Sequence, residues 1–306
     1  MDSKETADEF KGKLEMMFSG AFSCLKIMTG LEVGLFEVLS QFTEPKSYVE
    51  IADAGKLKPR YNQCTEEDRS TVYLYGRKFH GVSPEQYIDF ASHMSKVSAL
   101  SVDHHLITYI EQIDGLTDML DAGAKVLDLA CGTGHTTIVM AERFPKSTFI
   151  GGDFMPKQLD VGREMMKERH LSNVTLQQLD VENLPMEWTA SFDFILCHYA
   201  VHDLGNPEKG LQEFHRVLKA SGFGLIVDVN LHSKHSDNKQ NHFSNIEYGF
   251  SESHCLPASL WFEGGWGLGV GWGVEYATDF IGSCGFEVKM IENGHTVSYI
   301  IRKRNH

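Results

Sequence analysis

The sequence predicts an α/β fold in which a largely parallel sheet carries helices on both faces. From Lys125 onward, short apolar strands alternate with amphipathic helices or shorter crossovers, which is the pattern of a parallel sheet covered on both sides. Near the end of the chain, Asn293-Gly294 separates two apolar runs and predicts a closing antiparallel hairpin. The residues before position 83 have a different, mostly helical character, so a small N-terminal region precedes the main domain.

Seven strands and one late helix follow from this pattern. The predicted strands cover 124–130, 147–153, 174–180, 192–198, 223–229, 286–292 and 296–303. The predicted helix covers 276–285. The length of 306 residues suits one large α/β domain with an appendage.

The N-terminal region is predicted to be helical over 10–42, where apolar residues recur at helical spacing and glycines divide the run into two helices. Residues 43–80 are polar and are expected to be irregular. Ser83-Pro84 then resembles a helix start, with serine as the N-cap and proline at the first position. We therefore expect an N-terminal region over 1–82 and a main domain over 83–306.

Composition excludes several classes of function. A net charge of −14 argues against nucleic acid as a partner, because a phosphate binder needs a concentrated basic surface. No apolar run has the length of a membrane helix, and the polar first twenty residues are not a secretory signal, so we expect a cytoplasmic protein without a membrane partner. The six cysteines form no CxxC pair, and the histidine-containing segment 232–242 is interpreted as a solvated loop, so no metal site is expected.

The segment VLDLACGTGH (126–135) contains the first candidate binding site. A strand that carries Asp128 runs into Gly132 and Gly134 and then into a helix, an arrangement that lets a ligand approach the backbone and a helix N-terminus. A dinucleotide fingerprint needs a third glycine where this chain has Thr137. A carboxylate four residues before the first glycine is unhelpful beside pyrophosphate, but it suits the ammonium and sulfonium charges of S-adenosylmethionine.

Two further acidic residues follow the next two strands. Asp153 in IGGD can accept hydrogen bonds from both hydroxyls of a ribose. Asp180 in QLDVENLP can accept from an adenine amino group while Val181 lies against the ring. Three consecutive strands that end in aspartate, on one edge of the sheet, indicate a nucleoside ligand at that edge.

These motifs resemble those of class I S-adenosylmethionine-dependent methyltransferases. The resemblance covers 124–230 through VLDLACGTG, IGGD, QLDVENLP, FDFILCHYAVHDL and LQEFHRVLKASGFGLIVD, with Ala220 and Ser221 where that family usually has Pro and Gly. It implies a Rossmann-like, seven-stranded methyltransferase sheet and S-adenosylmethionine as cofactor, with S-adenosylhomocysteine as product. By position, the resemblance implies that Asp128, Gly132 and Gly134 hold the methionine end, Asp153 the ribose, Asp180 and Val181 the adenine, and that His198 lies beside the methionyl part. We also expect Ala130 and Phe154 in the cofactor site.

A narrower resemblance involves YAVHDL (199–204), residues 253–277 and the N-terminal segment. These are similar to a subgroup of small-molecule methyltransferases with a winged-helix-like segment before the catalytic domain. Here the second helix and the wing are expected to be shortened or missing, which weighs against a role of this segment in dimerisation or DNA contact. A homodimer through the N-terminal helices remains an expectation.

Residues 231–275 form an insertion that we expect to be a lid over the acceptor. It is longer than a bare connection and combines glycines with Trp261, Trp266 and Trp272. His202 and Asp203, which follow the fourth of these strands, are the candidate catalytic residues, with the histidine as a base. Tyr199 and His254 complete the candidate acceptor residues, and Cys255 is a weaker one.

The sequence therefore predicts an enzyme that methylates a small molecule, with a small thiol as the preferred acceptor. Three alternatives stay open: a protein that binds the cofactor as a sensor or partner subunit without turnover, a nicotinamide-dependent oxidoreductase and a DNA-binding regulator. Thr137 and the closing hairpin weigh against the second of these, and the net charge weighs against the third.

Overall fold

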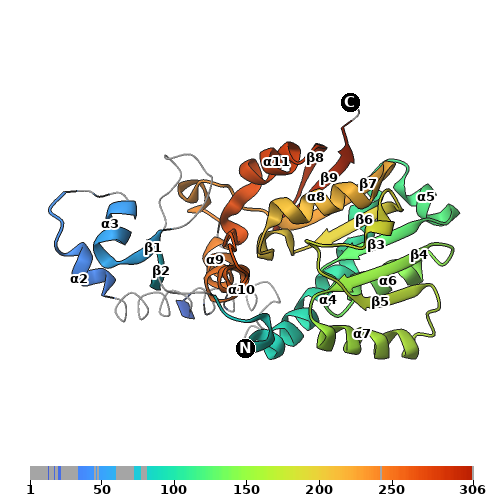
Figure 1. Ribbon diagram of the computed structural model, residues 1–306, viewed down its shortest axis with the longest axis horizontal. Coiled ribbons are helices and arrows are strands. Elements are labelled where there is room, and N and C mark those ends of the chain that lie inside the picture. The colour runs from blue at the N-terminus through green and yellow to red at the C-terminus, as the bar shows by residue number, and fades with distance from the viewer. Residues whose placement is uncertain are drawn as a thin grey trace, which may run out of the picture.

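The computed structural model describes residues 13, 17, 20–21, 34–44, 46, 48–59, 72–76, 81–241 and 243–304. Figure 1 shows a large α/β domain and, at the far end of the molecule, a small unit of two helices and two strands. The helices predicted over 10–42 lie mostly outside the described residues. The described residues of this range include helix α2, Leu35–Leu39. Among the described residues, no helix is both long and apolar enough to cross a membrane.

The main sheet has seven strands in the order β5-β4-β3-β6-β7-β9-β8. All neighbouring pairs are parallel except β7 with β9 and β9 with β8. The strands are β3 Lys125–Leu129, β4 Thr148–Asp153, β5 Val174–Gln178, β6 Phe192–His198, β7 Leu218–Val229, β8 Phe286–Asn293 and β9 Thr296–Lys303. All seven predicted strands are confirmed. The main difference is that β7 begins at Leu218, five residues before its predicted start.

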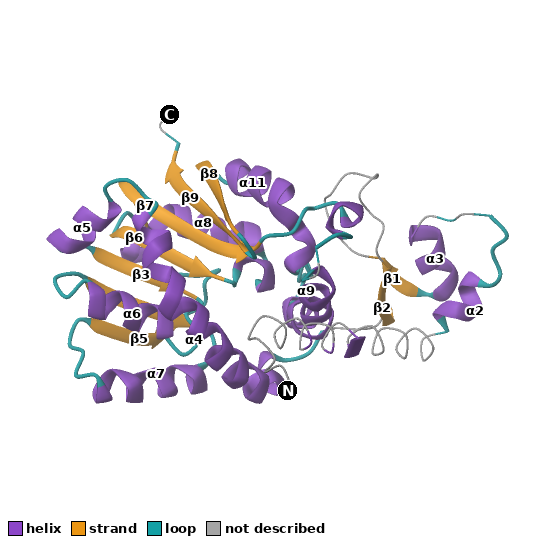
Figure 2. Cartoon of the chain, turned by 180° about the vertical axis from the view of Figure 1, so that it is seen from behind, coloured by secondary structure: helices purple, strands orange, loops and turns teal. Residues whose placement is uncertain are grey.

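Helices cover both faces of this sheet (Figures 1 and 2). They are α4 Ile88–Glu111, α5 Leu116–Ala122, α6 His135–Arg143, α7 Pro156–Glu168, α8 Pro207–Val217 and α11 Gly273–Ser283. Side chains alternate between the two faces along each strand. On β3, Val126 packs with residues of α4 to α7, whereas Leu127 packs with residues of α8 and α11. Each face therefore has its own apolar core.

The closing hairpin and the helix starts follow from local sequence chemistry. Asn293 pairs with Thr296, so the turn is Gly294-His295, and Gly294 has a φ of +73°, which favours glycine. The predicted helix start is confirmed as the short helix η2, Pro84–Tyr87, in which the Glu85 amide donates to Ser83 Oγ at 3.4 Å. A hairpin thus adds two antiparallel strands to a sheet that is otherwise parallel.

The segment 43–80 is more regular than its polar composition predicts. It contains helix α3, Tyr48–Gly55, and an antiparallel pair of strands, β1 Leu57–Pro59 and β2 Val72–Gly76. The second strand, VYLYG, is rich in β-branched and aromatic residues, which are the residue types that strands prefer. The expectation of an irregular segment is therefore wrong for these residues.

The insertion 231–275 is largely helical. Its elements are η5 His235–Asn238, α9 Ser244–Phe250, the π-helical turn η6 Ser251–Cys255, α10 Leu256–Trp261 and η7 Val270–Trp272. The solvated loop expected over 232–242 is anchored by Asn238, which is buried and bonds to both the amide and the carbonyl of His232. The Tyr248 hydroxyl accepts a further hydrogen bond from the Asn238 amide group. The insertion is thus a folded part of the domain and not an irregular glycine-rich loop.

Candidate functional site

The candidate site lies where the parallel strands β3 to β6 end, at the edge of the sheet that faces the insertion (Figure 1). In a parallel sheet the carboxyl ends of neighbouring strands share one edge, and ligands bind there. Asp128 lies within β3, Asp153 is the last residue of β4, and Asp180 follows β5 by two residues. His198 ends β6 and is followed by the 3-10 turn η4, Val201–Asp203.

Asp128 is a buried carboxylate with one satisfied and one unsatisfied oxygen. Its side chain is 1% exposed, and its Oδ2 accepts hydrogen bonds from the hydroxyls of Thr136 at 2.5 Å and Thr137 at 2.6 Å. Its Oδ1 is buried and has no hydrogen-bond partner among the described residues. Burial raises the pKa of Asp128 to about 6, against the two threonine bonds that lower it. An unsatisfied buried carboxylate oxygen is costly, so this atom is suited to a cationic ligand.

The turn after β3 is built on two left-handed glycines. Gly132 has a φ of +58° and Gly134 a φ of +75°. A Cβ on Gly134 would also stand 2.8 Å from a methyl carbon of Leu176, so this position disfavours other residues on two grounds. The turn therefore brings bare backbone to the edge of the sheet immediately before helix α6.

Asp153 fixes this turn. Its Oδ2 accepts from the Gly132 amide at 2.8 Å, and its Oδ1 accepts from the Met155 amide at 2.8 Å. Burial raises the pKa of Asp153, and the two amides act in the opposite direction. A carboxylate has about four acceptor positions, so two remain for ribose hydroxyls. Asp153 can therefore connect the glycine turn with a bound nucleoside.

Helix α4 closes over the same turn. Ser95 Oγ and Thr133 Oγ1 are 2.7 Å apart and share a hydrogen bond. At the first residue of α6, His135 Nε2 lies 2.8 Å from Asp103 Oδ1 of α4. These contacts cover the glycine turn with a helix from the N-terminal side of the domain, a feature that the motif alone did not reveal.

The remaining candidate cofactor residues lie along the same edge. Asp180 is exposed, and its Oδ1 accepts from the Glu182 amide at 2.9 Å, whereas Val181 is buried. Phe154 is 47% exposed and its ring contacts Phe262 of the insertion edge to face. Two other positions have distinctive local properties. Ala130 has a φ of +54°, and burial lowers the pKa of His198 to about 4, which leaves its imidazole neutral at pH 7.

His202 is held by a carboxylate that the sequence analysis did not single out. Its ring is 3% exposed, and its Nδ1 lies 2.8 and 2.9 Å from the two carboxylate oxygens of Asp228 on β7. Its Nε2 lies 3.3 Å from Asp203 Oδ1, so the two predicted catalytic residues do meet. Burial alone would lower the pKa of His202, but Asp228 and Asp203 together raise it well above its usual value.

Cys255 of the insertion completes a group of side chains around His202. This group, His202, Asp203, Asp228 and Cys255, is called the histidine cluster below. The nitrogen, oxygen and sulfur atoms of His202, Asp203 and Cys255 all lie within 4.8 Å of one another. Burial raises the pKa of the Cys255 thiol to about 12. Glu247 of helix α9 is a further acidic group near His202, and burial raises its pKa to about 7. The insertion thus contributes side chains to a cluster that begins at the end of β6.

The insertion is tied to the segment after β6 through three hydrogen bonds. Ser259 Oγ donates to the Leu204 carbonyl at 2.7 Å, the Trp266 amide donates to the Gly205 carbonyl at 2.9 Å, and the Gly269 amide donates to the His202 carbonyl at 3.0 Å. On its other side, the Val82 amide donates to the Pro257 carbonyl at 2.9 Å. These bonds fix the position of the insertion over the edge of the sheet.

The aromatic candidates for the acceptor differ in their surroundings. Trp272 is 1% exposed and belongs to the core around α11, so its ring packs the domain and is not an open pocket wall. Trp266 is half-buried beside Phe280, and Trp261 is 49% exposed. The three tryptophans, which the sequence analysis grouped as acceptor candidates, therefore lie in three different environments.

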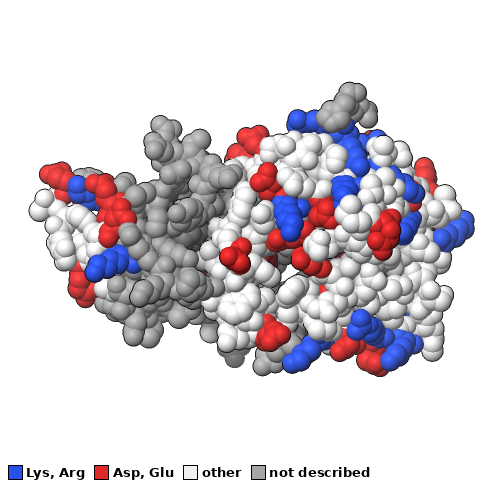
Figure 3. Space-filling model, viewed as in Figure 1, with Lys and Arg blue, Asp and Glu red and all other residues white. Residues whose placement is uncertain are grey.

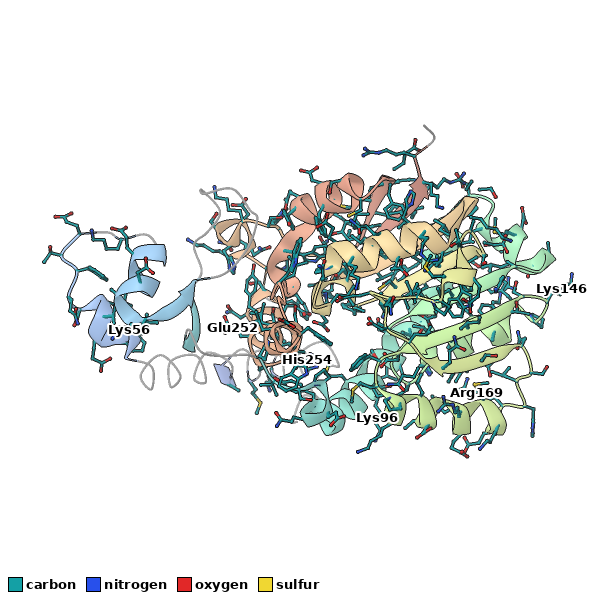
Figure 4. The ribbon with its side chains drawn as sticks, in the orientation of Figure 1. Lys56, Lys96, Lys146, Arg169, Glu252 and His254 are labelled. Carbon is teal, nitrogen blue, oxygen red and sulfur yellow. The ribbon has the colours of Figure 1, made fainter. Side chains whose placement is uncertain are left out.

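Two candidates lie closer to the histidine cluster. Tyr199 has a φ of +53° directly after β6, in a backbone region that costs energy and is concentrated at functional sites. His254 precedes Cys255, and its ring contacts Tyr87 at 4.7 Å between centroids. Figure 4 shows His254 in the helical insertion, on the side near the start of α4.

Asp228 is the residue that sequence reasoning missed most clearly. It lies near the end of β7, within the predicted strand FGLIVDV, and is fully buried. The rule that selected the other three aspartates, an acidic residue near the carboxyl end of a parallel strand, applies to it as well. Ser95 and Glu247, in contrast, carry no sequence signal, because only the tertiary arrangement brings them to this edge.

Comparison with known proteins shows which domain family part of this chain resembles. Residues 120–267 match the family model described as a methyltransferase domain. Over 111 residues the chain is 35% identical to the ubiquinone/menaquinone biosynthesis C-methyltransferase UbiE of Citrifermentans bemidjiense, covering 36% of this chain and 47% of that protein. Over 104 residues it is 36% identical to the uncharacterized methyltransferase YcgJ of Bacillus subtilis, covering 34% and 40%. The aligned part spans about half the length of these curated relatives or less.

Solved structures agree on the fold. An O-methyltransferase family protein from Burkholderia thailandensis has a TM-score of 0.53 at 17% identity, covering 70% of this chain and 58% of the other. A putative O-methyltransferase from Nostoc punctiforme has the same score and identity, covering 71% and 60%. The fold of the α/β domain is thus that of class I methyltransferases. The matched segment is similar to methyltransferase domains, whose cofactor is S-adenosylmethionine and whose product is S-adenosylhomocysteine. The winged-helix subgroup is not confirmed by these comparisons.

Proposed function

We propose that this protein is an enzyme that transfers a methyl group from S-adenosylmethionine to a small-molecule acceptor, and that the acceptor is a thiol. The observation that carries the proposal is Asp128, whose Oδ1 is buried beside a left-handed glycine turn without a partner among the described residues. Because Oδ2 accepts both threonine hydroxyls, Oδ1 remains available to a ligand. An ammonium group of the cofactor fits this atom in charge and hydrogen bonding.

The other residues at the edge would hold the rest of the cofactor. Asp153 offers its remaining lone pairs to the ribose hydroxyls, and Asp180 offers its second oxygen to the adenine amino group above Val181. His198, neutral at pH 7, adds no positive charge beside the methionyl part. When bound, S-adenosylmethionine supplies an activated methyl group, so the protein's main task is to orient the acceptor.

The histidine cluster is the acceptor side of the site in this proposal. It follows β6 directly, one strand away from Asp128 in the sheet, and the insertion covers it. The thiolate is the nucleophilic form of a thiol. To activate a thiol acceptor, the cluster therefore only has to favour loss of the thiol proton. The UbiE and demethylmenaquinone methyltransferase relatives are named for reactions on small molecules, which supports the acceptor's size class but not its identity.

Calorimetry followed by an acceptor panel tests this function. We expect S-adenosylmethionine and S-adenosylhomocysteine to bind, NAD to show no heat, and a member of a panel of small thiols, phenols and amines to be methylated. His202→Gln should lower turnover by about 10²–10⁴-fold while cofactor binding persists. His104→Gln, an exposed histidine on α4, is the matched control and should leave turnover unchanged. Binding of NAD alone would refute the proposal, and cofactor binding without turnover of any panel member would favour the sensor alternative.

A further inference from the structure

The cluster behind the insertion contains three different ligand types in one place. His202 and Asp203 lie on the turn η4 after β6, and Cys255 ends the π-helical turn η6, about fifty residues later in the chain. Their ligand atoms all lie within 4.8 Å of one another. His202 and Cys255 are both buried, at 3% and 6% exposure, and Asp203 is partly buried. An imidazole, a carboxylate and a thiol that converge away from solvent are the donor types that zinc sites use.

The orientation of His202 is one that metal-binding histidines adopt. Both oxygens of Asp228 face Nδ1, so this nitrogen carries the hydrogen and Nε2 points into the cluster. Metal-binding histidines are commonly oriented by a carboxylate on the other ring nitrogen. Asp228 is itself fully buried and also accepts from the Val229 amide at 2.7 Å, so the imidazole is held rigidly.

The geometry of Asp203 supplies an independent observation. Its Oδ1 is buried and forms no hydrogen bond with any of the residues that the structure describes, although it lies 3.3 Å from His202 Nε2. In a tetrahedral zinc site with bonds of about 2.0–2.1 Å to nitrogen and oxygen, two such ligand atoms are about 3.3–3.4 Å apart. The observed separation therefore equals one edge of that tetrahedron, so a cation bound to Nε2 and Oδ1 fits the distance between them.

The π-helical turn explains how the sulfur reaches this point. Helices α9 and α10 are joined through η6 without interruption, and the wider turn ends at Cys255. Such turns are rare, and they occur frequently at functional sites. On its other side Cys255 packs with Val229, Leu231 and Val270 in a small apolar cluster, which would shield the metal from solvent.

We propose that His202 Nε2, Asp203 Oδ1 and Cys255 Sγ bind a zinc ion, and that the fourth coordination position takes the acceptor thiol. The second half of this statement rests on the proposed methyltransferase function; the metal site itself does not. One Zn²⁺ replaces two protons, one from Nε2 and one from Sγ, so the total charge of the buried cluster is unchanged. A thiol in the fourth position loses its proton to solvent or buffer and is presented to the cofactor as a thiolate. This inference departs from the sequence analysis, which expected no metal.

Cobalt substitution of the full-length protein tests the site directly. The protein is stripped with a chelator, the chelator is removed, and Co²⁺ is titrated while the absorption spectrum is recorded. We expect one equivalent to bind, with the intense visible bands of a four-coordinate ion and a thiolate-to-cobalt charge-transfer band. Cys255→Ser should abolish the charge-transfer band, and Cys284→Ser, a half-buried cysteine at the end of α11, should leave it unchanged. Asp228→Asn should weaken metal binding by about 10–100-fold.

Each outcome separates the metal site from the methyltransferase function. Absence of a four-coordinate cobalt spectrum, with folding checked by circular dichroism, would overturn the metal site even if S-adenosylmethionine binds. A cobalt spectrum that persists in Cys255→Ser would equally overturn it. A cobalt spectrum that depends on Cys255, in a protein that fails to bind S-adenosylmethionine, would support the metal site and refute the proposed function. A shift of the cobalt bands on addition of a small thiol supports the open fourth position, and no shift with any thiol that is a substrate overturns that part.

Discussion

The affinity for S-adenosylmethionine should depend on pH through one buried carboxyl group. In the protein without cofactor, burial raises the pKa of Asp128 from 3.8 to about 6. A raised carboxyl pKa means that the neutral form is favoured by folding, so this stabilisation is present below the unfolded pKa and is lost as pH rises through about 6. A shift of about 2 pKa units corresponds to about 3 kcal/mol of folding free energy. The cofactor's ammonium group would recover that energy by pairing with the ionised form.

The size of the effect on binding follows from the ionised fraction. With a pKa of about 6, roughly one tenth of Asp128 is ionised at pH 5 and roughly nine tenths at pH 7. The apparent affinity should therefore rise about tenfold from pH 5 to pH 7, and binding should release protons. The cofactor's own amino group, with a pKa near that of an ordinary α-amino group at about 7.7–8.0, stays largely protonated over this range.

Calorimetry at half-unit steps of pH from 5 to 7, in two buffers of different ionisation enthalpy, measures both the affinity and the proton release. Asp128→Asn keeps the size of the side chain and should remove the rise, with weaker binding at pH 7 by about 1.5–3 kcal/mol. Asp121→Asn, on α5 in an exposed ion pair with Arg143 of α6, is the matched control and should retain the rise. A tenfold rise that persists in Asp128→Asn would show that another group titrates and that Asp128 does not meet the cofactor.

Three further predictions concern the cofactor edge and the core. Asp153→Ala should weaken cofactor binding by about 1–3 kcal/mol in calorimetry, and unchanged affinity would remove this residue from the site. Gly134→Ala should lower the free energy of unfolding in urea by about 1–3 kcal/mol, because its φ of +75° and the nearby Leu176 both disfavour a Cβ; a neutral result would mean that the turn relaxes. Trp272→Ala should cost about 3–5 kcal/mol in the same assay, whereas Trp261→Ala should stay within about 0.5 kcal/mol. Equal losses for the two tryptophans would contradict their different burial.

The sheet could be predicted from sequence because its signals are local and repeated. Each strand of the parallel part is an apolar run bounded by a helix, and the hairpin is marked by Asn293-Gly294. Where a strand begins is less well encoded: β7 extends back to Leu218 because Phe192 of β6 is available there as a pairing partner. The short strands β1 and β2 were missed because each is stabilised by its pairing with the other, which a window of sequence does not contain.

The cofactor side of the site was more predictable than the acceptor side for a similar reason. Asp128 and Asp153 are placed by strands that the pattern reveals, and their roles follow from one shared edge. The histidine cluster combines residues from η4, β7 and η6. His202 and Asp228, which pair in the structure, are 26 residues apart in sequence. Sequence adjacency favoured Asp203 as the partner, but the structure gives Nδ1 to Asp228 and leaves Asp203 facing Nε2. Only the fold distinguishes these two carboxylates.

Charged side chains are arranged differently on the surface of the domain and in its buried site. On the face drawn in Figure 3, basic side chains over the sheet domain are interspersed with acidic ones. The buried charges are the opposite case, since Asp128, Asp153 and Asp228 are all less than 9% exposed and all lie near the ends of parallel strands. Backbone amides, hydroxyls and one imidazole compensate them in part. Because the uncompensated charge is negative on both sides, we expect a cation at each. These are the ammonium and sulfonium of the cofactor beside Asp128, and the proposed metal beside Asp203.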